Sequence, residues 1–268
     1  MRSTGMPYAD SVIEVDHSTT SVPYVRSMYL AMNLFDSSII AFLNEPSHHF
    51  LIVDKIMKHI VDWQFVKGGL VFAVIWGLWF SYSGGSKQEQ VRTQIVSTLV
   101  ACICSLLLAQ VLEAGVFSRT RPIFSSDLQF VPPLGWNPSH YSGANCFPSD
   151  HATMYFALAT GIWFIHRVVG SILFLYVFLF ICFPRIYLGL HYPTDILAGA
   201  FLGIGMTMMF SSSRIRCHVA KPFLRRMGTT PSLYYACFFL VTFEMGNLFL
   251  NVRGIAKGAY HMFIFYWH

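Results

Sequence analysis

The chain has 268 residues, of which 54% are hydrophobic and only 12% are charged, and its formal net charge at pH 7 is +5. Few soluble globular proteins are this apolar, so the composition excludes an ordinary water-soluble enzyme and predicts a membrane protein.

The region before the first long apolar run divides into two predicted parts. Residues 1–25 form a loose terminus, because Met1–Val22 is polar, rich in serine and threonine, and lacks the pattern of a cleavable signal peptide. Residues 28–64 carry apolar side chains at helical spacing with charged residues between them. Helices with this pattern lie along a membrane surface or against other helices, so we expect interfacial amphipathic helices here.

Six apolar runs follow within residues 65–252, and their lengths approach what a helix needs to cross the bilayer core. They are Gly68–Tyr82, Thr93–Leu112, Ala152–Ile165, Val168–Pro184, Ile196–Ser213 and the less uniform Ser232–Leu250. Charged faces are missing from these runs, which argues against a soluble helical bundle. The sequence therefore predicts one all-α domain over residues 1–268, an integral membrane bundle with six transmembrane helices.

Basic residues in the connecting loops predict the orientation of this bundle. The loops after the first, third and fifth runs share one face and hold Lys87, Arg92, Arg167, Arg214, Arg216, Lys221, Arg225 and Arg226. We expect this face to be cytoplasmic and the loops after the second and fourth runs to face outward. Lys55, Lys58 and Lys67, before the first run, weaken the asymmetry.

The residues that carry chemistry lie in the two outward loops. The first, residues 113–151, holds Arg119, Arg121, Ser149, Asp150 and His151. The second, residues 185–195, holds Arg185, His191 and Asp195. If both loops lie on one face, three arginines, two histidines, a serine and carboxylates meet at the mouth of the bundle.

This combination suits a phosphate ester. Guanidinium groups remain charged and offer forked donors that match phosphoryl oxygens, so arginines can neutralise a five-coordinate transition state. Ser149 is a candidate N-cap, and the free amides after it can bind an anion. His151 follows in the first helical turn, where it can protonate a leaving oxygen.

The second loop predicts a nucleophile and a group that orients it. Pro193 suits the first position of a helix, with His191 just before it and Asp195 about one turn beyond. Asp195 can then accept a proton from one imidazole nitrogen and leave the other free to attack phosphorus.

Each of these residue types also has a simpler explanation. A single histidine beside a membrane span is more often an interfacial residue, which is our interpretation of His166 and His218. The arginines from Arg214 to Arg226 are explained by topology and lipid headgroups. Arg185 is harder to explain in this way, because it follows an apolar run on the face that otherwise carries little positive charge.

Three motifs, in this order, resemble the signature of the type-2 phosphatidic acid phosphatase (PAP2) superfamily. They are Arg121-Pro122, Pro148-Ser149-Asp150-His151, and the spaced set Arg185, His191 and Asp195. The matching residues lie mainly in 119–195, and the six-span layout extends the resemblance to most of the chain. It implies that His191 forms a phosphohistidine, His151 is the general acid and Asp195 orients His191. It also implies that Arg121, Ser149 and Arg185 hold the phosphate, and that no metal or other cofactor is needed.

The chain departs from this family's pattern at two positions. The first family motif usually begins with a lysine seven residues before the arginine-proline pair, and Ala114 stands there. The phosphate contact that this lysine makes in the family is therefore either absent here or supplied by Arg119. We include Arg119 and Asp150 in the predicted phosphate site. Glycine is the commonest family residue at position 150, and Ser-Asp-His is similar to the branch of bacterial undecaprenyl diphosphate phosphatases.

The sequence thus predicts a lipid diphosphate phosphatase in a bacterial cytoplasmic membrane, acting on undecaprenyl diphosphate with its site on the outer face. The partners expected are the lipid substrate and the bilayer, not a nucleic acid, and the sequence does not predict an oligomeric state. The alternatives are a lipid phosphotransferase using the same histidine, a phosphatase for phosphatidic acid or phosphatidylglycerol phosphate, and a non-catalytic phospholipid transporter or scaffold. Binding alone does not require two histidines and an aspartate, which favours an enzyme.

Overall fold

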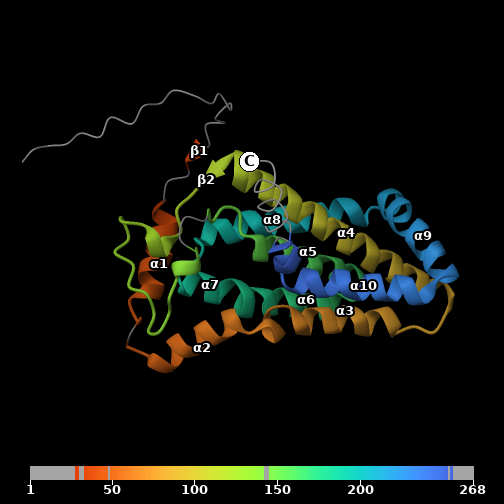
Figure 1. Cartoon of the computed structure of the whole chain (residues 1–268), viewed down its shortest axis with the longest axis horizontal. Helices are drawn as coiled ribbons and strands as arrows, with labels where there is room; N and C mark the ends of the chain where they lie inside the picture. The colour runs from red at the N-terminus through yellow and green to blue at the C-terminus, as the bar shows by residue number, and fades with distance from the viewer. Residues whose placement is uncertain (1–27, 30–32, 48, 142–144, 253, 256–268) are drawn as a thin grey trace, which may run out of the picture.

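The computed structural model describes residues 28–29, 33–47, 49–141, 145–252 and 254–255, so the predicted loose terminus 1–25 lies outside the described residues. The described chain is mainly helical, and most helices run along the long axis of the molecule (Figure 1). A short parallel pair joins β1 (Met28–Tyr29) to β2 (Phe117–Ser118).

The first half of the chain forms α1 (Leu34–Asn44), α2 (Leu51–Asp62), the π-helical segment η1 (Phe65–Gly69), α3 (Leu70–Phe80) and α4 (Gly85–Gly115). Two short 3-10 segments, η2 (Pro122–Phe124) and η3 (Ser139–Tyr141), lie in the long loop that follows. The second half forms α5 (Asp150–Ile165), α6 (Arg167–Tyr176), the π-helical segment η4 (Val177–Cys182), α7 (Phe183–Tyr187), α8 (Pro193–Ser211), α9 (Ser213–Thr229) and α10 (Pro231–Gly246).

Three helices of the described chain are long and apolar enough to cross a membrane, and this makes the protein an integral membrane protein. They are Gly85–Gly115, the continuous run Arg167–Tyr187, and Pro193–Ser211. The pair Leu51–Asp62 and Phe65–Phe80 gives a fourth if the two helices, bent by 62°, form one span. α5 and α10, which the sequence also predicts to be spans, have 16 residues each, fewer than the ~20 that the bilayer core requires.

Helix α5 lies in the centre of the bundle, packed against α4, α6 and α8, and most of its residues are buried. Its closest neighbour is α8, where glycines allow the two backbones to approach. A Cβ on Gly199 would lie 2.6 Å from the Ser149 carbonyl oxygen, and one on Gly203 would lie 2.1 Å from the Thr153 carbonyl oxygen. This close packing holds the beginnings of α5 and α8 side by side.

The outer surface of the bundle carries large apolar side chains. Exposed examples on α4, α5, α6, η4, α8 and α10 are Leu107, Phe164, Ile172, Leu175, Phe178, Leu197, Phe201, Met208, Phe239 and Phe243. Exposed apolar surface of this extent is unusual for a soluble monomer and matches a surface in contact with hydrocarbon.

Helices α1 and α2 pack against the bundle at the end where α7 lies (Figure 1). Both bury an acidic residue, Asp36 in α1 and Asp54 in α2. Asp54 accepts hydrogen bonds from the Tyr187 hydroxyl at 2.5 Å and from the Leu134 amide at 3.0 Å. The N-terminal helices are therefore attached to α7 and to the long loop by buried polar contacts as well as apolar ones.

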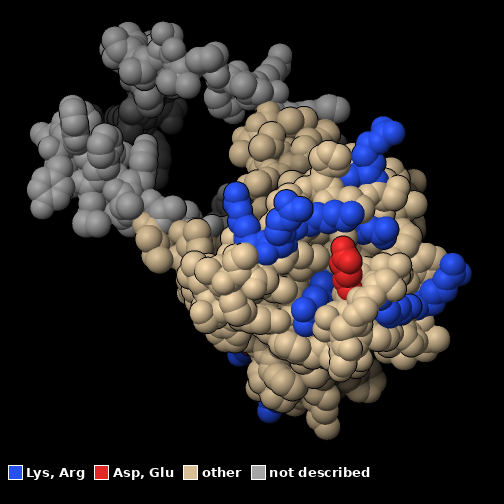
Figure 2. Space-filling model, turned by 90° about the vertical axis from the view of Figure 1, so that its right-hand side faces the viewer, with Lys and Arg blue, Asp and Glu red and all other residues tan. Residues whose placement is uncertain are grey.

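The opposite end of the molecule is basic. Figure 2 shows lysine and arginine side chains gathered on this face, with little acidic surface between them. Helix α9 lies at this end (Figure 1), and Lys221, Arg225 and Arg226 border a groove there together with Glu89. The basic cluster that the sequence placed in a loop therefore belongs to a helix.

Candidate active site

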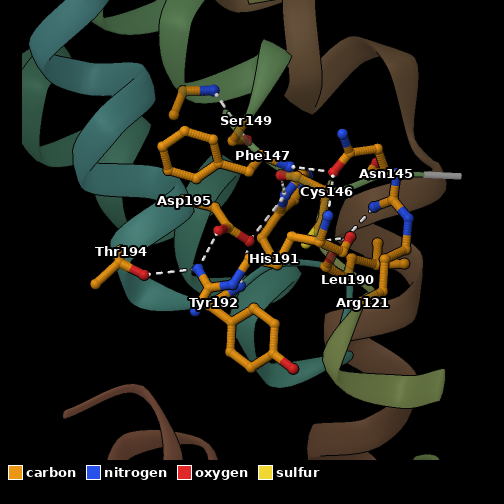
Figure 3. Close-up of polar contacts among 12 residues, drawn as sticks. Arg121, Asn145, Cys146, Phe147, Ser149, Leu190, His191, Tyr192, Thr194 and Asp195 are labelled. Atoms are coloured by element: carbon orange, nitrogen blue, oxygen red, sulfur yellow. Dashed lines mark hydrogen bonds and ion pairs between the residues drawn. The ribbon is translucent and has the colours of Figure 1, made fainter. Parts of the chain in front are cut away.

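Arg121 and Asn145 hold the two predicted loops together. Arg121 donates to the Leu190 carbonyl at 2.8 Å and to the Asn145 carbonyl at 3.1 Å, so one guanidinium bridges both loops (Figure 3). The Asn145 amide donates to the carbonyls of Glu113 and Phe117, and its oxygen accepts from the Arg119 amide at 2.9 Å. These contacts fix the described residues of loop 113–151 that lie next to the cavity, around Arg119, Arg121 and Asn145.

The beginnings of α5 and α8 meet directly. The Ser149 amide donates to the Asp195 carbonyl at 3.2 Å, and the Ser149 hydroxyl caps α5 by accepting from the Ala152 amide at 3.5 Å. Pro193 occupies the first turn of α8, and the Asp195 carboxylate accepts from the Tyr192 amide at 2.8 Å. The predicted helix starts at Ser149 and Pro193 are both confirmed.

His191 is held by a backbone carbonyl in addition to the predicted carboxylate. Its Nδ1 lies 2.9 Å from the Cys146 carbonyl oxygen and 3.8 Å from Asp195 Oδ2 (Figure 3). A carbonyl can only accept, so this contact places the proton on Nδ1 and leaves the Nε2 lone pair free. The carbonyl, which the sequence did not reveal as a partner, makes the hydrogen bond, and Asp195 acts at longer range.

The surroundings of His191 favour its neutral form. Burial lowers the pKa of His191 below its usual value of 6.5, and the positive charges of Arg121 and Arg185 act in the same direction, although Asp195 opposes them. At neutral pH the imidazole is therefore unprotonated at Nε2, which is the form that can act as a nucleophile.

Arg119 lies behind Asp195, within an ion-pair network. Its guanidinium pairs with Asp195 and with Asp36, the latter at 2.5 Å, and donates to the Thr194 hydroxyl at 2.7 Å. It also stacks over the Tyr192 ring, 3.9 Å from the centroid. Burial by itself would lower the pKa of Arg119, but Asp195 and Asp36 outweigh it and the pKa is raised.

Asp36 belongs to the site and was missed from the sequence. Fully buried in α1, its carboxylate accepts from the Thr194 amide at 3.0 Å and the Thr194 hydroxyl at 2.5 Å in addition to Arg119. The chain from Asp36 through Arg119 and Asp195 leads to His191. The one sequence signal was a carboxylate inside an apolar helical pattern, which is costly unless it is paired.

A cavity of about 300 Å³ lies on the other side of His191. The predicted site residues on its wall are Arg121, Asp150, His151, Arg185 and His191. Ser149, Asp195 and Arg119 are not part of the wall, because they lie behind it as cap, carboxylate and counter-ion. The geometry therefore favours a positioning role for Arg119 over the phosphate contact predicted from sequence.

Arg185 is the most unusual group in this cavity. Its exposed fraction is 2%, and the one hydrogen bond that its side chain donates to a described residue goes to the Ile181 carbonyl in η4. Among the described residues, no carboxylate forms an ion pair with it. A buried charge without a counter-ion is strongly unfavourable, so an anionic ligand in the cavity is the missing partner that this arrangement suits.

The end of α10 closes the cavity from the opposite side. Leu248 and Phe249 adopt left-handed backbone conformations, with φ of 51° and 56°, and turn the chain so that Leu248 and Leu250 reach the wall. Strained turns of this kind persist where the surroundings require them. In the described part of the chain, no group of three or more histidine, cysteine or acidic residues is arranged to hold a metal ion.

The chain is similar to several known proteins. Residues 93–218 match the PAP2 superfamily. The chain is 30% identical over 135 residues to the putative undecaprenyl-diphosphatase YbjG of Escherichia coli (strain K12), a match covering 50% of this chain and 60% of that protein. It is 27% identical over 164 residues to the undecaprenyl-diphosphatase BcrC of Bacillus subtilis (strain 168), covering 61% and 76%. The crystal structure of Aquifex aeolicus LpxE is 27% identical, with a TM-score of 0.44, over 68% of this chain and 95% of that one.

Proposed function

We propose that this chain, whose residues 93–218 match the PAP2 superfamily, is a membrane lipid phosphatase that hydrolyses undecaprenyl diphosphate to undecaprenyl phosphate. The observation that carries the proposal is the buried, unpaired Arg185 in a cavity shared with His191. An anion is needed to balance the arginine, and a neutral imidazole with a free Nε2 lies where it can attack that anion. The names of the two undecaprenyl-diphosphatase relatives support the choice of lipid.

In the first step, Nε2 of His191 attacks the terminal phosphorus, and the bond between that phosphorus and the bridging oxygen breaks. His151, on the same cavity wall, is protonated once the negatively charged diphosphate lies beside it; it gives this proton to the bridging oxygen, so the lipid leaves as its monophosphate. Arg121 and Arg185 hold the equatorial oxygens of the transferred group. The Cys146 carbonyl and Asp195 stabilise the positive charge that develops on the imidazole.

In the second step, water attacks the phosphohistidine. His151, now neutral, accepts a proton from the water, the nitrogen–phosphorus bond breaks, and inorganic phosphate leaves. His191 returns to its neutral form with its proton on Nδ1, and the net reaction consumes one water for each phosphate released.

Three predicted site residues receive different roles from this geometry. Arg119 positions Asp195, and Ser149 fixes the start of α5 and hence the place of His151. Asp150 lies on the cavity wall, but a carboxylate repels phosphate, so we assign the phosphate contacts to arginine and not to Asp150.

The arrangement of the helices also leads us to a proposed orientation of the protein in the membrane. We assign six spans, counting the central α5 and the shorter α10 with the longer helices, because α5 is surrounded by protein and need not match the full bilayer thickness by itself. The basic α9 end (Figure 2) then faces the cytoplasm. The cavity, near the other end of the bundle, opens to the outer side of a bacterial membrane. Helices α1 and α2 lie near the outer interface.

The direct test measures phosphate release by purified protein in detergent from undecaprenyl diphosphate in the presence of EDTA. We expect His191→Ala to abolish release while His218→Ala, an exposed histidine on α9, leaves it unchanged. Equal release by both variants would remove His191 from the reaction. Labelled phosphate appearing on an acceptor lipid, and not in solution, would instead identify a phosphotransferase.

A further inference from the structure

An apolar groove begins where the phosphate cavity ends. It encloses about 350 Å³ between η1, α3 and α10 and is bordered by side chains that include Phe65, Phe72, Trp76, Phe239 and Phe243. Gln64, Gly246 and Asn247 border both the groove and the cavity. The groove and the cavity are therefore neighbours that share one wall. The groove is apolar, whereas the cavity is rich in cationic groups.

The shared wall depends on a close approach of two backbones. A Cβ on Gly68 would lie 2.9 Å from both the Cα and the carbonyl oxygen of Gly246, so a larger residue at position 68 would push η1 away from α10. The Tyr155 hydroxyl donates to the Gly246 carbonyl at 3.3 Å, and the Tyr176 hydroxyl donates to the Val66 carbonyl at 2.5 Å. These tyrosines, from α5 and α6, hold both sides of the junction in place.

The π-helical segment η1 presents two kinds of residue to these two spaces. Phe65, Gly68 and Gly69 border the groove, whereas Lys67 borders the cavity together with Arg121 and Arg185. Single π-helical turns are frequent at functional sites, because the extra residue changes the direction of the side chains. Within the described part of the chain, the Lys67 ammonium forms no ion pair or side-chain hydrogen bond.

We propose that the groove between α3 and α10 receives the hydrocarbon chain of the substrate, and that Lys67 binds the phosphate nearest to that chain. This deepens the proposed function and rests on it. A lipid diphosphate whose terminal phosphate lies between Arg121, Arg185 and His191 must extend its tail towards an apolar surface that is open to the bilayer. The groove is the apolar space bordering this cavity, and Lys67 is the cation on the segment between them.

Lys67 also explains how the chain functions with alanine at position 114. Phosphate binding needs an ammonium or guanidinium near the bridging region, and a lysine from η1 supplies it in place of one from α4. Because Lys67 lies outside residues 93–218, this contact comes from a part of the chain that the family match does not cover.

The experiment compares a long and a short substrate, undecaprenyl diphosphate and isopentenyl diphosphate, with full-length protein in detergent. Ala73 is exposed on the groove wall, and Ala73→Phe fills part of the groove. We expect its KM for the long substrate to rise about tenfold, since about two methylene groups lose their burial, and its KM for the short one to stay unchanged. Gly77→Phe, in open space one turn further along α3, is the matched control.

Lys67→Met should raise KM about tenfold for both substrates, Lys67→Arg should restore most of the loss, and the exposed Lys55→Met should have no effect. Activity on the short substrate shows that each variant is folded. Equal long-chain KM values for Ala73→Phe and Gly77→Phe, or for Lys67→Met and Lys55→Met, would overturn the groove or the lysine assignment respectively. No release from either substrate by the unmodified protein would instead overturn the proposed function itself.

Discussion

Replacing Gly203 by alanine tests whether the close packing of α5 and α8 sets the geometry of the reaction. The new Cβ would lie 2.1 Å from the Thr153 carbonyl oxygen, whereas ordinary contact begins at 3.4 Å, so the helices must separate by about 1.3 Å, the difference between these distances. Thr153 is two residues beyond His151, and Gly203 lies on the helix that begins just after His191. A misplacement of about 1 Å between reacting groups costs roughly 100-fold in rate.

We therefore expect Gly203→Ala to lower kcat for phosphate release about 100-fold and to destabilise the fold by about 1–3 kcal/mol through overpacking. Gly205→Ala is the matched control, because it makes the same change in the same helix where nothing lies within 4 Å. Both variants gain the same helix propensity, about 1 kcal/mol. Equal turnover by the two variants, measured as initial phosphate release in one detergent, would refute the reasoning.

Three further predictions follow from the site. Because burial and neighbouring arginines lower the pKa of His191, kcat/KM should begin to fall only below about pH 6.5. Asp195→Asn removes a negative charge that favours the protonated imidazole, so it should shift this fall in kcat/KM to lower pH. A shift to higher pH would contradict the assignment of His191. Asp36→Ala should lower the free energy of unfolding, measured by thermal unfolding in detergent, by about 3 kcal/mol, since it breaks a buried ion pair. Asp127→Ala, at an exposed position, should leave it unchanged. Equal melting temperatures for the two variants would contradict a structural role of Asp36 in the network. In a variant without native cysteines, Ser126→Cys, on the long loop, should react with an impermeant maleimide added outside intact cells, and reaction only after lysis would reverse the proposed orientation.

The sequence predicted the parts of the site that depend on local order along the chain. Ser149 and Pro193 were recognised as helix starts, and Pro193 placed His191 just before α8 and Asp195 in its first turn. Short-range rules suffice here, because caps and first-turn positions are set by neighbours in sequence.

Contacts between distant segments could not be predicted in the same way. The Cys146 carbonyl that orients His191 is a backbone group with no residue-type signal, and Asp36 lies 83 positions from its partner Arg119. Lys67 was counted as a topological charge, and only the folded arrangement of η1 brings it to the cavity wall. Arg119 was predicted to bind phosphate because guanidinium groups match phosphoryl oxygens. In the structure, however, its guanidinium is paired with two buried carboxylates, Asp36 and Asp195.

Helix lengths show the same limit of sequence reasoning. Apolar composition marked α5 and α10 as spans, yet the helices are 16 residues long. α5 is apolar chiefly because it is the centre of a protein core, and composition alone does not distinguish a residue facing protein from one facing lipid.

The central claim is that His191 becomes phosphorylated during turnover. Protein mixed with undecaprenyl diphosphate labelled in its terminal phosphate and quenched in alkali should carry an acid-labile, base-stable label, which peptide mapping should locate at His191. Label on a different residue, or full turnover by His191→Ala, would contradict the account.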